Sequence, residues 1–212
     1  FVLRVQGGAG AGAGAQASKS LDSWFAHVPG LRVVAPSQPA DAKGMLTAAI
    51  RDPNPVIYLE HKLLNRQRGA MPDGAHVAAL DQAARLRDGS DATIVASLRM
   101  THEAMRAANA LAESGVDADL IDLRSVRPID FETIVASVKK TGRLIVAIEE
   151  WRSFGVGAEI AAGVVERAFS ALKCPPRRLG LRECAIPHAK ALEDAVLFDH
   201  SDIEAAARDL MS

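Results

Sequence analysis

The first residues of the chain constrain its fold most, because a β-strand pattern runs directly into a glycine-rich loop. Residues 1–5 (FVLRV) are mainly apolar, and residues 7–14 mix glycine with alanine, a composition typical of a strand followed by a tight loop. A parallel α/β sheet has to be covered on both faces. Residues 1–65 supply only about three strands and two helices, so we expect them to form the second part of a larger domain.

Residues 1–76 alternate between strand and helix patterns. A surface linker is predicted at 65–76, where Arg, Gly and Pro gather, with a domain boundary near 66–80. The predicted strands lie at 1–5, 31–35 and 56–59, and the helices at 21–28 and 39–51. The first helix should have one apolar face and the second a buried face, formed respectively by Leu21, Trp24, Phe25 and Val28, and by Met45, Leu46, Ala49 and Ile50.

The second half of the chain repeats the alternation more completely. Gly115 suits the left-handed position that ends a helix, and Asp130 and Ser201 suit helix N-caps. Strands separated by helices indicate a mostly parallel sheet with right-handed crossovers, so we expect a three-layer α/β domain. Its predicted strands lie at 92–97, 119–123, 144–148 and 179–182, and its helices at 101–114, 130–141, 157–172 and 201–210.

Charge and composition exclude several classes of function. The 212 residues include 25 Lys and Arg against 26 Asp and Glu, so no strong field favours a nucleic acid or a membrane surface as partner. No apolar run approaches the length of a membrane span. Cys174 and Cys184 belong to no CxxC or Cys/His cluster, so we expect reduced thiols in a reducing compartment.

The glycine run fits the dinucleotide-binding pattern G-x-G-x-x-G/A in three overlapping registers, which makes the match uninformative. The registers start at Gly8, Gly10 and Gly12. That fingerprint also needs an acidic residue after the next strand to hold a ribose, and the strand at 31–34 is followed by Ala35. We therefore expect these glycines to permit close approach of neighbouring chain, with a phosphate-cradling loop as the alternative.

Two polar pairs stand at the ends of predicted strands. They are Glu149 with Glu150, and His61 with Glu60. Ligands of open α/β sheets bind beyond the carboxyl ends of the strands, so both pairs are candidate site residues, although solvated strand-end charges are the simpler interpretation. The sequence has no G-x-S-x-G or H-E-x-x-H motif, and its six histidines share no ligand spacing, which argues against metal catalysis by side chains.

Motifs along essentially the whole chain resemble those of one enzyme family. After the glycine loop they read AQAS (15–18), WF (24–25), VPGLRVVAP (28–36), AAIRDPNP (48–55), LEHKLL (59–64), LRSVRPID (123–130), EEW (149–151), FGVGAE (154–159) and IPHAKALE (186–193). In this order they resemble the β subunit of the thiamine-dependent, decarboxylating component of 2-oxo acid dehydrogenase complexes. The pyruvate, branched-chain and acetoin versions share them.

The resemblance implies a fold, a cofactor and partners. Residues 1–70 would be the second half of a transketolase-like pyrimidine-binding α/β domain, 71–80 a linker, and 81–212 a three-layer transketolase C-terminal-type α/β domain with a mostly parallel sheet. The cofactor would be thiamine diphosphate with Mg²⁺, shared with a separate α subunit. The partners would be that α subunit, a second β subunit and a lipoyl acyltransferase core, in the cytoplasm or, in a eukaryote, the mitochondrial matrix.

The reaction that the resemblance implies is oxidative decarboxylation of a 2-oxo acid, or cleavage of acetoin, with acyl transfer to lipoamide. In the family, a histidine beside the cofactor's thiazolium handles protons in that transfer, and this chain has Ala17 there. A methyl group can neither donate nor accept a proton, and a positioned acid–base group contributes roughly 10²–10⁴ in rate. The family glutamate that hydrogen-bonds the aminopyrimidine would lie upstream of Phe1. We therefore expect the isolated chain to be inactive, and a non-catalytic assembly partner is the alternative.

The resemblance also implies a monovalent cation site, usually for potassium, built mainly from backbone carbonyls. Irregular backbone at a helix end can form such a cage, because the last carbonyls of a helix have no partner within it. A helix terminated by proline is the simpler interpretation of the same residues. The implied ligands are Phe1, Ala49, Ile50, Asp52 and Asn54.

Overall fold

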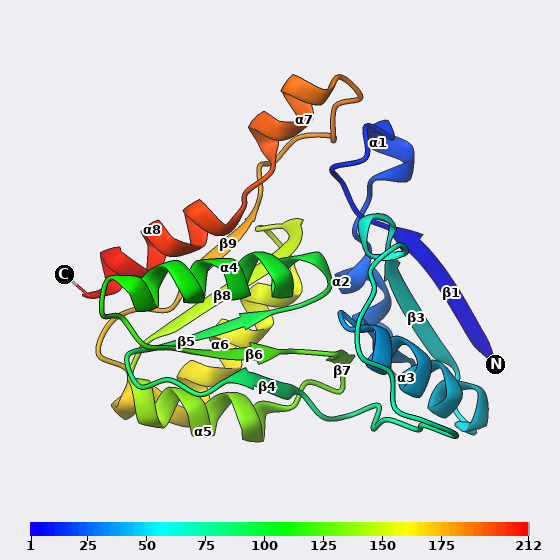
Figure 1. The fold of residues 1–212 in the computed structure, drawn as a ribbon, viewed down its shortest axis with the longest axis horizontal. Helices are drawn as coiled ribbons and strands as arrows, with labels where there is room; N and C mark the ends of the chain where they lie inside the picture. The colour runs from blue at the N-terminus through cyan, green and yellow to red at the C-terminus, as the bar shows by residue number, and fades with distance from the viewer. Residues whose placement is uncertain (212) are drawn as a thin grey trace.

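The computed structural model describes residues 1–211, and their strands form two mostly parallel sheets. Figure 1 shows the two sheets side by side, with the N-terminal strands on the right. The first sheet has the order β1-β3-β2-β7, in which β7 pairs antiparallel with β2. Its strands are β1 (Val2–Gly7), β2 (Arg32–Val34), β3 (Val56–His61) and β7 (Ser125–Arg127).

The second sheet has the order β4-β6-β5-β8-β9, and only its edge strand β4 runs antiparallel to its neighbour among the described strands. Strands β5, β6 and most of β8 are buried on both faces, which is why they read as unbroken apolar runs. The strands are β4 (Ala84–Arg87), β5 (Ala92–Ala96), β6 (Ala118–Asp122), β8 (Leu144–Trp151) and β9 (Arg177–Leu181).

Helices cover both faces of the second sheet, as Figure 1 shows. Helices α4 and α8 lie on one face over a core that includes Ile94, Leu120 and Ile145. Helices α5 and α6 lie on the other face over a core that also takes in residues of the first sheet, such as Ile57. These four helices are α4 (Arg99–Glu113), α5 (Phe131–Thr141), α6 (Val156–Ala168) and α8 (His200–Met211).

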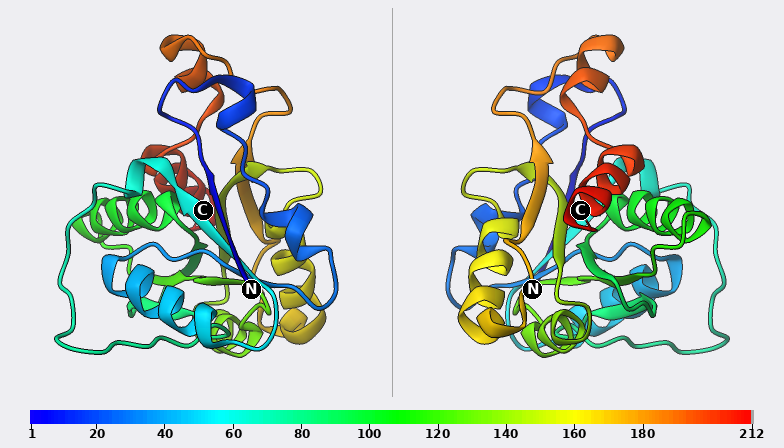
Figure 2. Two further views of the ribbon diagram at one scale, coloured as in Figure 1. Left: turned by 90° about the vertical axis from the view of Figure 1, so that its right-hand side faces the viewer. Right: turned by 90° about the vertical axis from the view of Figure 1, so that its left-hand side faces the viewer.

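The remaining helices and turns lie outside the group that covers the second sheet. Two views at right angles to Figure 1 show α7 lying beside the loop that carries α1, although the two are far apart in sequence (Figure 2). No helix within residues 1–211 is long and apolar enough to cross a membrane. The remaining elements are α1 (Gly14–Ala17), α2 (Asp22–Ala26), α3 (Pro39–Arg51), the 3-10 turns η1 (Lys62–Leu64) and η2 (Phe169–Ala171), and α7 (Lys190–Val196).

The predicted α/β class with a mostly parallel sheet is confirmed, and two of the three predicted helix ends are correct. Asp130 caps α5 by accepting a hydrogen bond from the Thr133 amide at 3.0 Å. Gly115 has the predicted left-handed conformation, with φ +81°. Ser201 is not the N-cap of α8. The helix already includes His200, and the Asp199 carboxylate accepts the Ser201 amide at 2.8 Å, because a carboxylate one residue before the helix reaches that amide.

The two predicted apolar helix faces are only partly buried. Helix α2 is a single short turn, so Phe25 packs against the core while Trp24 is 73% exposed and Val28 is 45% exposed. In α3, Met45 is buried as predicted, but Ile50 is 69% exposed because it lies in the last turn, facing away from the sheet.

The short helix α1 and the turn η1 were not predicted from the sequence, and neither were β4, β7 and α7. Strand β4 is an antiparallel edge strand rich in arginine, and β7 is only three residues long, so neither has the apolar run of a buried strand. Helix α7 lies within the segment that follows β9, and its seven residues are too few to show a helical period. Strand β7 matters for the fold, because it places residues 125–127 of the second half in the first sheet.

Candidate functional site

The candidate site lies where the carboxyl ends of β1 and β3 meet β8. Gly7 and His61 are register partners at the ends of β1 and β3. Their sheet edge faces Glu149 of β8, whose carboxylate lies 3.0 Å from the His61 ring. Both side chains are buried, with 1% and 5% of their surfaces exposed, so the two sheets share a polar contact from which water is excluded.

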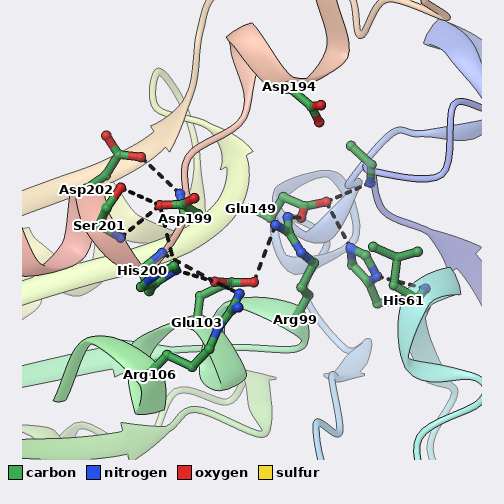
Figure 3. A network of polar contacts seen from close by, with 12 residues as sticks. His61, Arg99, Glu103, Arg106, Glu149, Asp194, Asp199, His200, Ser201 and Asp202 are labelled. Carbon is green, nitrogen blue, oxygen red and sulfur yellow. Dashed lines mark hydrogen bonds and ion pairs between the residues drawn. The ribbon is translucent and has the colours of Figure 1, made fainter. Parts of the chain in front are cut away.

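Figure 3 shows Glu149 between His61 and Arg99. The His61 Nδ1 accepts a hydrogen bond from the Leu63 amide at 3.2 Å. The proton of a neutral His61 ring is therefore on Nε2, which donates to Glu149 Oε1. Arg99, at the start of α4, binds the other oxygen of Glu149 at 2.8 Å and also approaches Glu103 at 3.5 Å.

The environment of Glu149 keeps it ionised. Burial raises its pKa, but the hydrogen bond and charge contact with His61, the Ala9 amide and the Arg99 guanidinium outweigh burial, so the pKa lies below its ordinary value. A buried carboxylate with partners for both oxygens is a fixed anion rather than a proton donor. The interpretation of Glu149 as a solvated strand-end charge is wrong. So is that of His61 as the partner of Glu60, which pairs with Arg4 at 2.6 Å.

The glycine loop is held by carboxylates of this same chain. The Ala9 amide donates to Glu149 at 2.7 Å, and the Gly10 and Gly12 amides donate to the two oxygens of Glu193 at 2.8 and 2.9 Å. Gly8 has φ +89°, and a Cβ there would lie 2.3 Å from the His61 ring. The expected role of the glycines, close approach of neighbouring chain, is confirmed, and these three amides are already engaged by carboxylates rather than open to a phosphate.

Glu150 and Asp22 form a second buried acidic pair beside the first network. Burial raises the pKa of each carboxyl above its ordinary value, and the charge of Asp22 raises that of Glu150 further. The Glu150 Oε1 accepts the Gly157 amide at 3.0 Å, at the start of α6. Glu150 also lines a cavity of about 580 Å³, together with Trp24 and Phe154. Burial therefore favours the protonated form of both carboxyls.

A third buried acid, Asp122, joins the two halves of the chain. Its carboxylate accepts hydrogen bonds from the hydroxyl of Ser37 and, at 3.2 Å, from that of Thr101. Burial is the largest influence on its pKa and raises it to about 7. Ser37 also accepts a hydrogen bond from the His102 ring through its carbonyl, at 2.8 Å.

Position 17 lies at the end of the one-turn helix that follows the glycine loop. Ala17 is exposed, and its carbonyl accepts a hydrogen bond from the Lys62 ammonium group. Its side chain is a methyl group, so this position has no proton to transfer. His61 and Glu149, at the start of the glycine loop, are buried and engaged with each other.

The implied cation ligands lie at the opposite end of the first sheet, where α3 leads into β3. The Phe1 carbonyl accepts the Val56 amide at 3.0 Å, and the Ala49 carbonyl accepts the Asp52 amide at 3.3 Å. The Asp52 carboxylate accepts the backbone amide of Asn54 at 2.7 Å and its side-chain amide at 2.8 Å. Phe1 thus lies beside Val56 at the start of β3, whereas Ile50 lies in the last turn of α3, and the cation site stays a prediction.

Sequence reasoning missed Arg99, Glu193, Asp22 and Asp122. None of the four lies in a recognisable catalytic spacing, and their partners lie 50 or more residues away in the sequence for Arg99–Glu149, Glu193–Gly10 and Asp122–Ser37. The one available signal was an acidic residue at the end of a buried strand, which applies to Asp122.

Comparison with known proteins places this geometry in a class. Residues 1–67 match the pyrimidine-binding domain of transketolase, and residues 81–203 match its C-terminal domain. A solved structure described as an inactive β4 tetramer of split-gene transketolase is similar with a TM-score of 0.82, over 99% of this chain and 65% of its own, at 24% identity. The fold is that of a transketolase-type α/β protein.

Comparison of sequences shows which transketolase-type proteins the chain is similar to. The chain is 42% identical to the β subunit of acetoin:2,6-dichlorophenolindophenol oxidoreductase from Cupriavidus necator, over 99% of this chain and 62% of the relative. It is 43% identical to the mitochondrial pyruvate dehydrogenase E1 subunit β-1 of Arabidopsis thaliana, over 98% and 58%. It is 41% identical to the mitochondrial pyruvate dehydrogenase E1 subunit β of Dictyostelium discoideum, over 91% of this chain and 55% of the relative.

The chain thus spans 55 to 62% of the length of these three relatives. It belongs to the transketolase-like family of pyruvate and acetoin dehydrogenase β subunits. The resemblance seen in the sequence motifs is confirmed, and the family uses thiamine diphosphate.

Proposed function

We propose that this chain serves as the β subunit of a thiamine diphosphate-dependent 2-oxo acid dehydrogenase, acting with a separate α subunit and a second β subunit. The observation that carries the proposal is the similarity over nearly the whole chain to β subunits of pyruvate and acetoin enzymes. The reaction would be oxidative decarboxylation of a 2-oxo acid, or acetoin cleavage, with acyl transfer to lipoamide on an acyltransferase core. The proposed compartment is the cytoplasm or, in a eukaryote, the mitochondrial matrix.

The described residues do not fit the whole cofactor. Within residues 1–211, no group of three or more His, Cys, Asp or Glu side chains is placed to hold a metal ion, and Ala17 has no proton to transfer. We therefore assign Mg²⁺ and the diphosphate to the α subunit and derive no step through the cofactor from this chain. Its proposed contribution is structural: His61, Glu149 and Arg99 fix the end of the glycine loop.

The proposed organisation is the second part of a pyrimidine-binding domain at 1–70, a linker at 71–80 and a C-terminal domain at 81–212. A potassium ion is part of the same proposal, held mainly by backbone carbonyls of Phe1, Ala49, Ile50, Asp52 and Asn54. Its support is the hydrogen bond from the Val56 amide, which places the Phe1 carbonyl at the start of β3, two residues after Asn54.

A second candidate function is favoured by one residue. Ala17 occupies the position where the family resemblance implies a proton-handling histidine. A subunit retained for assembly, which binds the α subunit and the acyltransferase core without turnover, would tolerate this residue. The two candidate functions differ in one property: the enzyme subunit would support conversion of substrate in the assembled protein, and the assembly partner would not.

The test uses the natural full-length chain, purified together with its α subunit. Reduction of 2,6-dichlorophenolindophenol with pyruvate, branched-chain 2-oxo acids or acetoin should depend on added thiamine diphosphate. Lipoamide acylation should rise by roughly 10²–10⁴ in Ala17→His, the range for a positioned acid–base group, while cofactor affinity stays unchanged.

Two outcomes would decide against the enzyme. If the assembly binds the cofactor but neither form turns over any of these substrates, the assembly-partner function is favoured. If the chain fails to bind an α subunit at all, both candidate functions fail.

A further inference from the structure

Glu193 makes an unusual contact for a residue on a short surface helix. It lies in α7, yet its side chain is fully buried, and both of its carboxylate oxygens accept backbone amides from the glycine loop, at 2.8 Å from Gly10 and 2.9 Å from Gly12. The residues are 183 and 181 positions apart. In all three views of the fold, α7 and the loop lie next to each other (Figures 1 and 2).

The neighbouring residue provides a contrast within the same helix. Asp194 is half exposed and forms an ion pair with Lys190, one turn earlier in the helix. Figure 3 shows Asp194 apart from the dashed network around Glu149. The burial of Glu193 is therefore specific to its contact with the loop and is not a general property of α7.

The loop conformation suits a bound anion. Gly10 and Gly12 both have positive φ, +93° and +65°, and left-handed residues at alternate positions of a loop can direct their amides towards one concave side. Amides aimed at a carboxylate form charge-assisted hydrogen bonds, which are shorter and stronger than neutral ones. A bidentate carboxylate thus fixes two alternate residues of the loop relative to each other.

The fixed loop leads directly into position 17. Helix α1 begins at Gly14, two residues after the second contact, and ends at Ala17. His188, which precedes α7, lies against Gly12 and Gly14: Cβ atoms added at these glycines would lie 3.7 and 3.6 Å from it. At the other end of the loop, Glu149 accepts the Ala9 amide. The C-terminal half therefore holds the loop from both ends.

We propose that Glu193 is a positioning residue, which fixes the glycine loop and, through it, α1 and position 17 against the C-terminal half of the chain. The effect on turnover rests on the proposed function, whereas the effect on loop order does not. In the assembled enzyme, Glu193 would set where the residue at position 17 meets the reacting group.

Amide hydrogen exchange tests the contact directly. In the natural full-length chain bound to its α subunit, Glu193→Gln should raise the exchange rates of the Gly10 and Gly12 amides by about 10- to 100-fold, the range expected for losing a charge-assisted hydrogen bond. Glutamine keeps the length of the side chain but loses the charge and one acceptor oxygen. Asp194→Asn is the matched control and should leave both rates unchanged. Equal exchange in the two variants would overturn the proposal.

A measurement on the unsubstituted protein covers the case in which the variant does not fold. The Gly10 and Gly12 amides should exchange at least about tenfold more slowly than that of Ala11, the exposed residue between them. If all three amides exchange at one rate, Glu193 does not hold the loop.

The catalytic readout separates positioning from general destabilisation. In the active assembly carrying Ala17→His, adding Glu193→Gln should lower kcat by roughly 10- to 100-fold with KM for the 2-oxo acid changed less than about threefold, because misplacement of the imidazole at position 17 affects the transition state more than substrate binding. Unchanged kcat despite faster loop exchange would refute the positioning role. If the wild-type assembly has no activity, the proposed function fails while the exchange result still decides whether Glu193 holds the loop.

Discussion

Replacing Asp122 with asparagine should stabilise the chain more at pH 8 than at pH 5. The Asp122 carboxyl is buried at the end of β6, and burial raises its pKa to about 7 although the hydrogen bond from Ser37 acts in the opposite direction. The folded chain therefore keeps a proton on Asp122 at pH values where the unfolded chain has lost it. Folding then becomes less favourable as the pH rises.

The size of the effect follows from the two pKa values. The ordinary value of 3.8 applies to the unfolded chain and about 7 to the folded one. The stabilising contribution of the bound proton is complete below the lower value and is lost as the pH rises through the higher one. The loss amounts to about 4 kcal/mol in all, and to about 2–3 kcal/mol between pH 5 and pH 8. Asparagine has no proton to lose in this range.

Urea unfolding between pH 5 and pH 8 measures the difference in free energy of unfolding between Asp122→Asn and the wild type. This difference should move in favour of the variant by about 2–3 kcal/mol over that range. A constant offset from altered hydrogen bonds with Ser37 and Thr101 does not affect the slope. Asp73→Asn, in an exposed segment, is the control. A difference that stays constant within about 0.5 kcal/mol would refute the argument that Asp122 is buried with its proton.

Two further substitutions test the loop and a helix cap. Gly8→Ala should lower the free energy of unfolding, measured with urea, by about 2 kcal/mol or more, because the added Cβ would overlap the His61 ring. The control is Gly74→Ala, at a similar positive φ but with open space around it, which should lower the free energy of unfolding by less. If the two cost the same, the contact with His61 is not close. Asp130→Ala should cost about 1 kcal/mol at pH 7 through loss of the cap. Burial raises the pKa of Asp130, but hydrogen bonds from Thr133 and the Ala83 amide lower it below 3.8 overall. The loss of unfolding free energy in Asp130→Ala should therefore shrink as the pH falls below about 4. A loss that does not change with pH would contradict this.

The order of strands and helices in the second half could be predicted because buried parallel strands leave a simple pattern. Strands β5 and β8 are apolar runs of the right length, and the helices between them have apolar faces that contact the sheet. Strand β7 could not be predicted, since three residues carry no periodicity and its pairing with β2 joins segments about 90 residues apart. The exposure of Trp24 and Ile50 could not be predicted either, because the spacing of apolar residues does not show which of them contact the sheet.

The candidate site was predictable in position but not in pairing. Parallel strands bring their carboxyl ends to one edge, so His61 and Glu149 could each be expected at an edge of its own sheet. Their contact depends on how the two sheets pack, which no local pattern encodes for residues 88 positions apart. The ionisation of the acids could not be predicted either, although Glu149 and Glu150 are adjacent in the sequence. Partners on both oxygens lower the pKa of Glu149, whereas burial beside Asp22 raises the pKa of Glu150.

The glycine loop illustrates why a motif needs its partner before it can be assigned a ligand. A loop whose amides converge carries partial positive charge and is stabilised by an anion, and in nucleotide-binding folds a phosphate supplies it. Here Glu149 and Glu193 supply the anion from within the chain. Both carboxylates lie in the C-terminal half, so the loop reaches this conformation only when that half has folded against the first sheet. These contacts leave the Ala9, Gly10 and Gly12 amides unavailable to a phosphate, and they connect the glycine loop of the first half to the second half. The place of position 17, at the end of the helix that follows the loop, therefore depends on the contact between the two halves.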